Sequence, residues 1–123
     1  MKLIIAGSRK WSHSAALALV RSALEEKFRD VFSRMTELVS GGCRGIDAAA
    51  EDYCYKIGKP SKTFIAEWDT YGKAAGPIRN RQMAEYADEL LLIWDGKSRG
   101  SASMKREMER LGKPIWEFVV GDA

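Results

Sequence analysis

Apolar residues along this chain alternate between short unbroken runs and longer stretches in which they recur every three or four positions. The short runs are typical of β-strands and cover residues 2–6, 37–40, 62–66, 89–94 and 115–119. The stretches between them have the period of amphipathic helices. The pattern therefore predicts the element order βαβαβαβαβ.

Four helices are predicted from the recurring apolar positions. These positions are, in chain order, Leu17, Val20, Leu24, Phe28 and Val31; Ile46, Ala49, Ala50, Tyr53 and Ile57; Ile78, Met83, Ala84 and Ala87; and Met104, Met108 and Leu111. Ser12 or Ser14 fits as the N-cap of the first helix, and Pro77 fits the first turn of the third. Glycine and proline follow the second helix at Gly58 and Pro60, so we expect it to end there.

Strands that are separated by helices cannot pair as hairpins, so we expect a parallel sheet covered by helices on both faces. The unbroken apolar run at 90–94 is typical of a central strand that is buried on both sides. The predicted fold class is α/β: a three-layer, Rossmann-like, doubly wound parallel sheet of five strands in the order 3-2-1-4-5. The order 2-1-3-4-5 is the alternative.

Length and composition limit the classes of protein to which the chain can belong. Its 123 residues fit one domain, residues 1–123, and the longest apolar run is far shorter than the roughly 20 residues of a membrane span. Two cysteines and one histidine argue against a disulfide framework and most zinc sites, so we expect no metal and no cofactor. We expect a cytoplasmic protein with no membrane partner.

Three of the predicted strands end in glycine-bearing turns that lead into helices, at residues 7–11, 40–47 and 95–101. Glycine lets backbone N–H groups converge on one point, and the N-terminus of the following helix adds partial positive charge. Such a turn is an anion cradle, most often for phosphate. Glycine also serves tight turns that bind nothing, but three such turns at one edge of the sheet favour phosphate.

Basic residues gather in or beside the loops at this one edge of the sheet. They are Arg9, Lys10, Arg44, Lys73, Arg79, Arg81, Lys97 and Arg99, against the carboxylates Asp47, Asp69 and Asp95. Because the net charge of the whole chain is only +3, this local excess of cations suits an anion of nucleotide size better than a long nucleic acid. Trp11, Trp68 and Tyr71 flank the predicted crevice, where they would either stack on a base or pack into the core.

Two familiar phosphate-binding motifs are absent. Gly96-Lys97-Ser98 resembles the end of a Walker A loop, but Leu91 occupies the position of its first glycine. No Gly-x-Gly-x-x-Gly fingerprint follows the first strand. The phosphate hypothesis therefore depends on the turns and cations themselves.

Several stretches match a recognisable pattern over nearly the whole chain. They are Gly7-Ser8-Arg9, residues 39–47 (VSGGCRGID), Trp68, residues 71–80 (YGKAAGPIRN), Met83, Ala87-Asp88 and Ser98-Arg99-Gly100. On these residues, of which 71–80 are the most specific, the chain resembles the YspA-type branch of the SLOG superfamily. That superfamily groups Rossmann-like domains of the DNA-processing protein DprA/Smf and of the LOG phosphoribohydrolases.

The resemblance implies a Rossmann-like fold that binds nucleotides or ligands derived from them. LOG enzymes release the base from a nucleoside 5′-monophosphate, and their arginine four residues before a methionine matches Arg79 and Met83. Their glycine-rich loop falls loosely on residues 98–101, and their catalytic glutamate falls on Met104. A thioether cannot take up a proton, which leaves Asp95 or Asp47 as the carboxylates for that chemistry.

Three functions follow as hypotheses. The first is a sensor or binding module for a nucleotide-like anion, with an ADP-ribose-like ligand as one option. The predicted ligand-binding residues are Gly7, Ser8, Arg9, Ser40, Gly41, Gly42, Arg44, Gly45, Asp47, Arg79, Asn80, Lys97, Ser98, Gly100 and Ser101. The second is a nucleotide hydrolase of the LOG type with Arg79 and Asp95 as catalytic residues. The third is DprA-like binding of single-stranded DNA. A homodimer formed through an exposed Met104 or Met108 is a further option, although core packing explains both methionines equally well.

Overall fold

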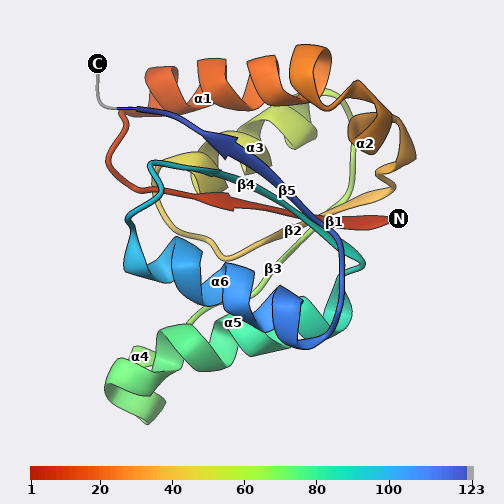
Figure 1. The fold of residues 1–123 in the computed structure, drawn as a ribbon. Helices are drawn as coiled ribbons and strands as arrows, with labels where there is room; N and C mark the ends of the chain where they lie inside the picture. Colours follow the sequence, from red (N-terminus) through yellow and green to blue (C-terminus); the bar gives the residue numbers. More distant parts are fainter. Residues whose placement is uncertain (122–123) are drawn as a thin grey trace.

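The computed structural model describes residues 1–121 and contains a parallel five-stranded sheet in the order β3-β2-β1-β4-β5 (Figure 1). The strands are β1 (Lys2–Gly7), β2 (Glu37–Ser40), β3 (Ser61–Thr63), β4 (Glu89–Trp94) and β5 (Ile115–Val119). The predicted order 3-2-1-4-5 is confirmed, and the alternative 2-1-3-4-5 is excluded. The first and fourth strands are neighbours whose register runs from Leu3 opposite Glu89 to Gly7 opposite Ile93, so they end at the same edge.

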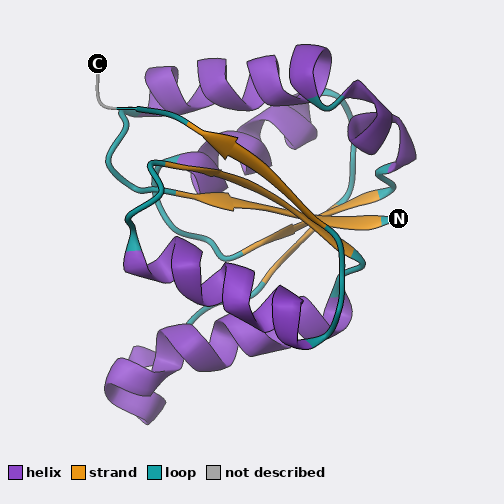
Figure 2. Ribbon diagram, viewed as in Figure 1, coloured by secondary structure: helices purple, strands orange, loops and turns teal. Residues whose placement is uncertain are grey.

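Helices cover both faces of this sheet, which makes the predicted three layers (Figure 2). On one face lie α1 (His13–Ser22), α2 (Arg29–Arg34) and α3 (Ile46–Lys56), and on the other lie α5 (Ala75–Tyr86) and α6 (Arg99–Arg110). Successive residues of a strand point to opposite faces. Leu3 and Ile5 of β1 therefore join the core beneath the first three helices, while Ile4 packs with the residues of α5 and α6.

The first predicted helix is divided into three parts. After α1, a π-helical turn, η1 (Ala23–Lys27), is closed by the Phe28 N–H donating to the Ala23 carbonyl at 2.7 Å, and α2 follows. The extra residue in this turn shifts the helical phase, and Leu24 and Val31 are both buried as their periodicity predicts. Of the two candidate N-caps, Ser12 performs the role, because its Oγ accepts from the Ala15 N–H at 3.2 Å.

The region around β3 differs from the prediction. The strand is Ser61–Thr63 rather than residues 62–66, because the chain leaves the sheet after the Phe64 N–H donates to the Ser40 carbonyl at 2.8 Å. Two short helices then precede α5, namely α4 (Trp68–Tyr71) and the 3-10 turn η2 (Gly72–Ala74). Ile57, predicted on the buried face of α3, is the exposed residue at which that helix ends.

Met104 and Met108 are both buried in the core between α6 and the sheet. The option of a homodimer built on exposed methionines at these positions is therefore wrong, and core packing accounts for both side chains. Within residues 1–121, no helix combines the length and apolar character that crossing a bilayer requires.

The close approach of β1 to β4 depends on Gly7. A Cβ added at this position would overlap the carbonyl oxygen of Ile93, a backbone atom that cannot move aside cheaply. We expect Gly7→Ala to lower the free energy of unfolding by about 1–3 kcal/mol, measured by urea denaturation. Gly100→Ala is the matched control, because a Cβ there meets open space and alanine favours the helix. Equal stability of the two variants would contradict the expectation.

Candidate functional site

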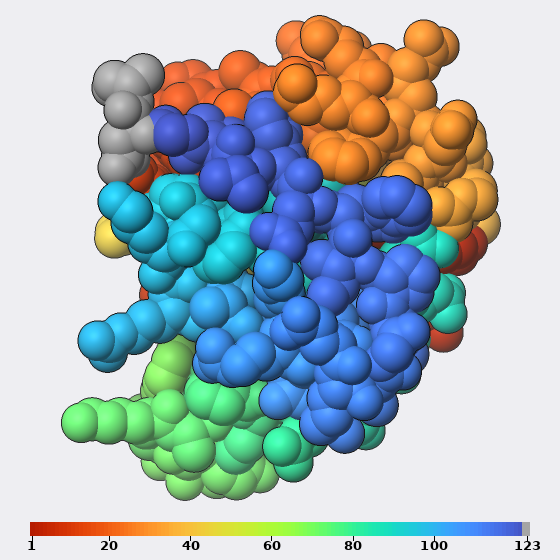
Figure 3. All heavy atoms as spheres, viewed as in Figure 1, coloured from red at the N-terminus to blue at the C-terminus, as the bar shows by residue number. Residues whose placement is uncertain are grey.

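A cavity of about 420 Å³ opens at the carboxyl edge of the sheet, where β1 and β4 end and α6 begins (Figure 1). It lies at the point where the strand order reverses, which is where open α/β sheets bind ligands. The lining residues are Ala6, Gly7, Ser8, Arg9, Lys10, Gly41, Cys43, Arg44, Asp47, Arg79, Asn80, Met83, Asp95, Ser98, Arg99, Gly100, Ser101 and Met104. In the space-filling view, two side chains project from this edge of the molecule, one at the start of α6 and one just before α5 (Figure 3).

Most of the residues predicted from the sequence line this cavity. They are Gly7, Ser8, Arg9, Gly41, Arg44, Asp47, Arg79, Asn80, Asp95, Ser98, Gly100 and Ser101. Four do not: Ser40, Gly42, Gly45 and Lys97. The Ser40 Oγ is buried and accepts from the Gly42 N–H at 3.2 Å, while the backbone N–H of Lys97 donates to Asp95 and its side chain is exposed.

Gly45 has a structural part in the site. Its φ of +78° is a left-handed conformation, and a Cβ there would lie 2.7 Å from the Ser8 carbonyl oxygen. Glycine therefore lets the second loop pack directly on the first, at the start of α3. This contact holds the ends of β1 and β2 together beneath the cavity.

Arg79, from α5, is the central cation of the cavity, and it is only 7% exposed. Its Nη1 donates to the Gly41 carbonyl at 2.7 Å and lies 3.7 Å from the Cys43 Sγ, and its Nε donates to the Asn80 Oδ1 at 3.1 Å. Within residues 1–121, the second terminal nitrogen, Nη2, makes no hydrogen bond. It is not sealed off from solvent either. One edge of the guanidinium is thus held by the protein, and the other is open to an anion.

Asp47, in the first turn of α3, faces the same space and is 6% exposed. Its Oδ2 accepts from the Cys43 N–H at 3.3 Å. Burial raises the pKa of Asp47 from 3.8 to about 6, although the Cys43 N–H and the charge of Arg79 act in the opposite direction. A buried carboxylate that titrates near neutral pH is a feature of functional sites more often than of inert cores.

The third glycine-bearing loop presents the N-terminus of α6 to the cavity. The carboxylate of Asp95 organises this loop, because its Oδ1 accepts from the N–H groups of Lys97 at 2.9 Å and of Ser98 at 3.0 Å. These two hydrogen bonds lower the pKa of Asp95 below its ordinary value, and the bond from the Lys97 N–H has the largest effect. The positive charge of Lys10 acts in the same direction. No hydrogen bond within residues 1–121 engages the N–H groups at 99–101, the first three of the helix.

Ser101 adds an unpartnered polar atom to this helix end. The residue is 5% exposed and lines the cavity, yet within the described chain its Oγ has no hydrogen-bond partner. A buried hydroxyl without a partner costs free energy, so such atoms are rare unless a ligand or water meets them. The Asn80 Nδ2 approaches from α5 and donates to the Ser103 Oγ at 3.2 Å, which joins the two helices below the cavity.

Three polar residues of the cavity were not among the predicted ligand-binding residues: Lys10, Cys43 and Arg99. Each of the three lies in one of the glycine-bearing turns, and Lys10 and Arg99 are also basic, so turn position and charge together could have identified them. With them, five basic side chains line the cavity, Arg9, Lys10, Arg44, Arg79 and Arg99, against the carboxylates Asp47 and Asp95. The Lys10 Nζ lies 3.6 Å from Asp95. The balance of charge at the cavity favours an anionic ligand.

Comparison with known proteins gives one sequence relative and no assigned activity. The chain is 28% identical over 124 residues to the Gene 61 protein of Mycobacterium phage D29, and the match covers 95% of each chain. No family model matches the chain, and no solved structure matches it.

Proposed function

We propose that this protein is a binding module for a nucleotide or a nucleotide-derived phosphate, of the YspA-type branch of the SLOG superfamily. The observation that carries the proposal is the free edge of the buried Arg79 guanidinium, which faces the same cavity as an unpartnered helix N-terminus. A guanidinium and a helix N-terminus are both ligands for phosphate.

The phosphate binds between α5 and α6. The N–H groups at 99–101 and the Ser101 Oγ donate to its oxygens from one side, and the Arg79 Nη2 donates from the other. Arg9 and Arg44 line the same cavity and add positive charge without being buried. The rest of the cavity volume is left for a sugar and a base.

We expect phosphorylated ligands to raise the melting temperature of the protein, and adenosine to have no effect. The panel is ribose 5-phosphate, AMP, ADP and ADP-ribose, measured by thermal shift. A ligand present at a hundred times its Kd adds about 2.7 kcal/mol to the free energy of unfolding. Ser101→Ala should weaken binding several-fold because it removes one donor, while Ser33→Ala, on exposed α2, serves as control. Stabilisation by adenosine as strong as that by AMP would contradict the phosphate site.

A second candidate function is hydrolysis of the N-glycosidic bond of a nucleoside phosphate. It is favoured by the two carboxylates of the cavity, since the pKa of Asp47 is raised to about 6 and that of Asp95 is lowered. Asp47 would protonate the departing base, and Asp95 would take a proton from the attacking water. Met104 lines the cavity where LOG enzymes carry glutamate. Free adenine in the AMP incubations, lost in Asp47→Asn, would favour hydrolysis; stabilisation without adenine favours the binding module.

Binding of single-stranded DNA has less support. A single strand needs positive charge that follows its backbone along a groove, whereas the five basic side chains of the cavity surround a single hollow.

A further inference from the structure

We propose that Trp68 is the base-binding wall of this site, a platform on which the planar ring of the ligand stacks. The inference rests on the proposed function, which supplies the phosphate end of the ligand. It adds the other end, a purine or similar flat aromatic ring, and the residue that recognises it.

Trp68 begins α4 and is 53% exposed, which is unusual for so large an apolar side chain. The tip of its indole rests on α5, because the Cη2 atom lies 3.3 Å from the position a Cβ would take on Gly76. Gly76 and Asn80 are four residues apart in α5 and so lie on the same face, separated by one turn of about 5.4 Å. Asn80 lines the cavity, so the indole sits one helical turn beyond its wall.

Ile65, from the same connection, lies beside the second glycine-bearing loop. It is 67% exposed, and its Cδ1 lies 3.0 Å from the position a Cβ would take on Gly42. Gly42 stands between two cavity-lining residues, Gly41 and Cys43. The connection between β3 and α5 thus places one exposed apolar side chain, Ile65, beside the second glycine-bearing loop, and another, Trp68, against α5.

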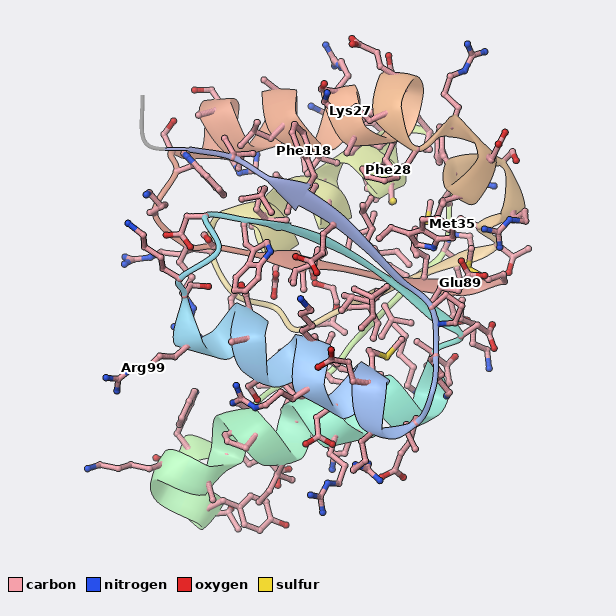
Figure 4. The ribbon with its side chains drawn as sticks, viewed as in Figure 1. Lys27, Phe28, Met35, Glu89, Arg99 and Phe118 are labelled. Atoms are coloured by element: carbon pink, nitrogen blue, oxygen red, sulfur yellow. The ribbon has the colours of Figure 1, made fainter. Side chains whose placement is uncertain are left out.

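The separation between these parts suits a nucleotide. The Asn80 Nδ2 lies 3.4 Å from the Gly100 carbonyl at the start of α6, so the phosphate position and Trp68 are about one helical turn apart along α5. A ribose bridges a gap of this size. Arg99 extends outward from the start of α6 on the side of the molecule where α4 lies (Figure 4).

The chemistry of the cationic cavity and of the apolar side chains beside it also indicates which class of ligand binds there. Five cations line the cavity, and the exposed apolar side chains of Trp68 and Ile65 lie next to it, which together fit a ligand that is anionic at one end and flat and apolar at the other. A nucleoside phosphate has this form. A protein partner or a second copy of the chain would cover Trp68 without needing the cationic cavity next to it.

The test compares AMP with ribose 5-phosphate on the wild type, Trp68→Ala and Trp68→Phe, by titration calorimetry and by quenching of tryptophan emission. We expect AMP to bind about tenfold or more tightly than ribose 5-phosphate, and Trp68→Ala to remove that advantage while leaving ribose 5-phosphate affinity unchanged. Trp68→Phe keeps most of the advantage but loses the quenching. Tyr55→Ala, which removes an exposed aromatic side chain on α3 away from the cavity, is the matched control and should bind both ligands normally.

Each other outcome overturns the inference in a recognisable way. If AMP and ribose 5-phosphate bind equally well to the wild type, the phosphate site stands and the stacking platform does not. If Trp68→Ala weakens both ligands equally, Trp68 only supports α5. If the wild type self-associates in sedimentation and Trp68→Ala does not, the indole is a protein contact. If neither ligand binds, the proposed function fails and the base wall fails with it.

Discussion

Arg79→Lys is expected to weaken the binding of ribose 5-phosphate by about 30-fold or more while the protein remains folded. The ammonium group replaces one charge with another, but it cannot donate to the Gly41 carbonyl and to a phosphate oxygen from two edges of a plane, as a guanidinium can. Losing a charge-assisted bond in a buried site costs about 2 kcal/mol or more, which corresponds to the stated factor. Titration calorimetry with ribose 5-phosphate measures it.

Controls separate this effect from loss of stability. Arg106→Lys changes an exposed arginine of α6 and should bind ribose 5-phosphate as the wild type does. Arg79→Ala removes the strong donor to the Gly41 carbonyl and leaves it only the weak bond from the Cys43 Sγ at 3.9 Å, so it should also lose about 1–3 kcal/mol of stability. Unchanged affinity in a folded Arg79→Lys protein would remove the foundation of the phosphate site.

Asp47→Asn is expected to make the protein more stable at pH 8 and to leave its stability nearly unchanged at pH 4. Burial raises the pKa of Asp47 from 3.8 to about 6, so the folded protein holds a proton that the unfolded chain releases between these values. The stability linked to this proton is complete below about pH 4 and is lost as the pH rises through 6. A shift of about two units corresponds to about 3 kcal/mol, which asparagine recovers because it carries no charge.

Urea denaturation of both proteins at several pH values between 4 and 8 measures this difference. Asp52→Asn is the control of opposite sign, because the hydrogen bond to His13, followed by that to Lys56, lowers the pKa of the exposed Asp52. Its ionised form is the favoured one, so asparagine gives no gain in stability at pH 8. If Asp47→Asn proves less stable than the wild type at pH 8, the ionised carboxylate is stabilised in the fold and the pKa argument is wrong.

The topology was predictable because it depends on the type of element rather than on its exact ends. A strict alternation of strands and helices admits few arrangements, and the buried run at β4 marks an interior strand of the sheet, next to the central β1. The short β3 was not placed correctly, because the apolar residues Phe64 and Ile65 continue a strand-like pattern past the point where the chain leaves the sheet. The π-helical turn at Ala23–Lys27 was also not predicted, since one inserted residue leaves both flanking apolar stripes buried.

The site was predictable to the extent that loops at the ends of parallel strands must meet at one edge. This placed Gly7, Gly41 and Gly100 around one hollow, although they are far apart in the sequence. What periodicity and loop position could not give is which groups remain unpaired and which carboxylate is buried. The open edge of Arg79 and the raised pKa of Asp47 arise from contacts between loops, and no local pattern encodes them.

The connection between β3 and α5, residues 64–74, lies against the second glycine-bearing loop where Ile65 passes Gly42, and against α5 where Trp68 passes Gly76. No strand of the sheet runs through it, and the groups proposed to hold the phosphate lie outside it. The sequence of this connection can therefore change, or be replaced by the connection of another chain with this fold, without altering the sheet. Selectivity for the base would change with the connection, while the binding of the phosphate stayed the same.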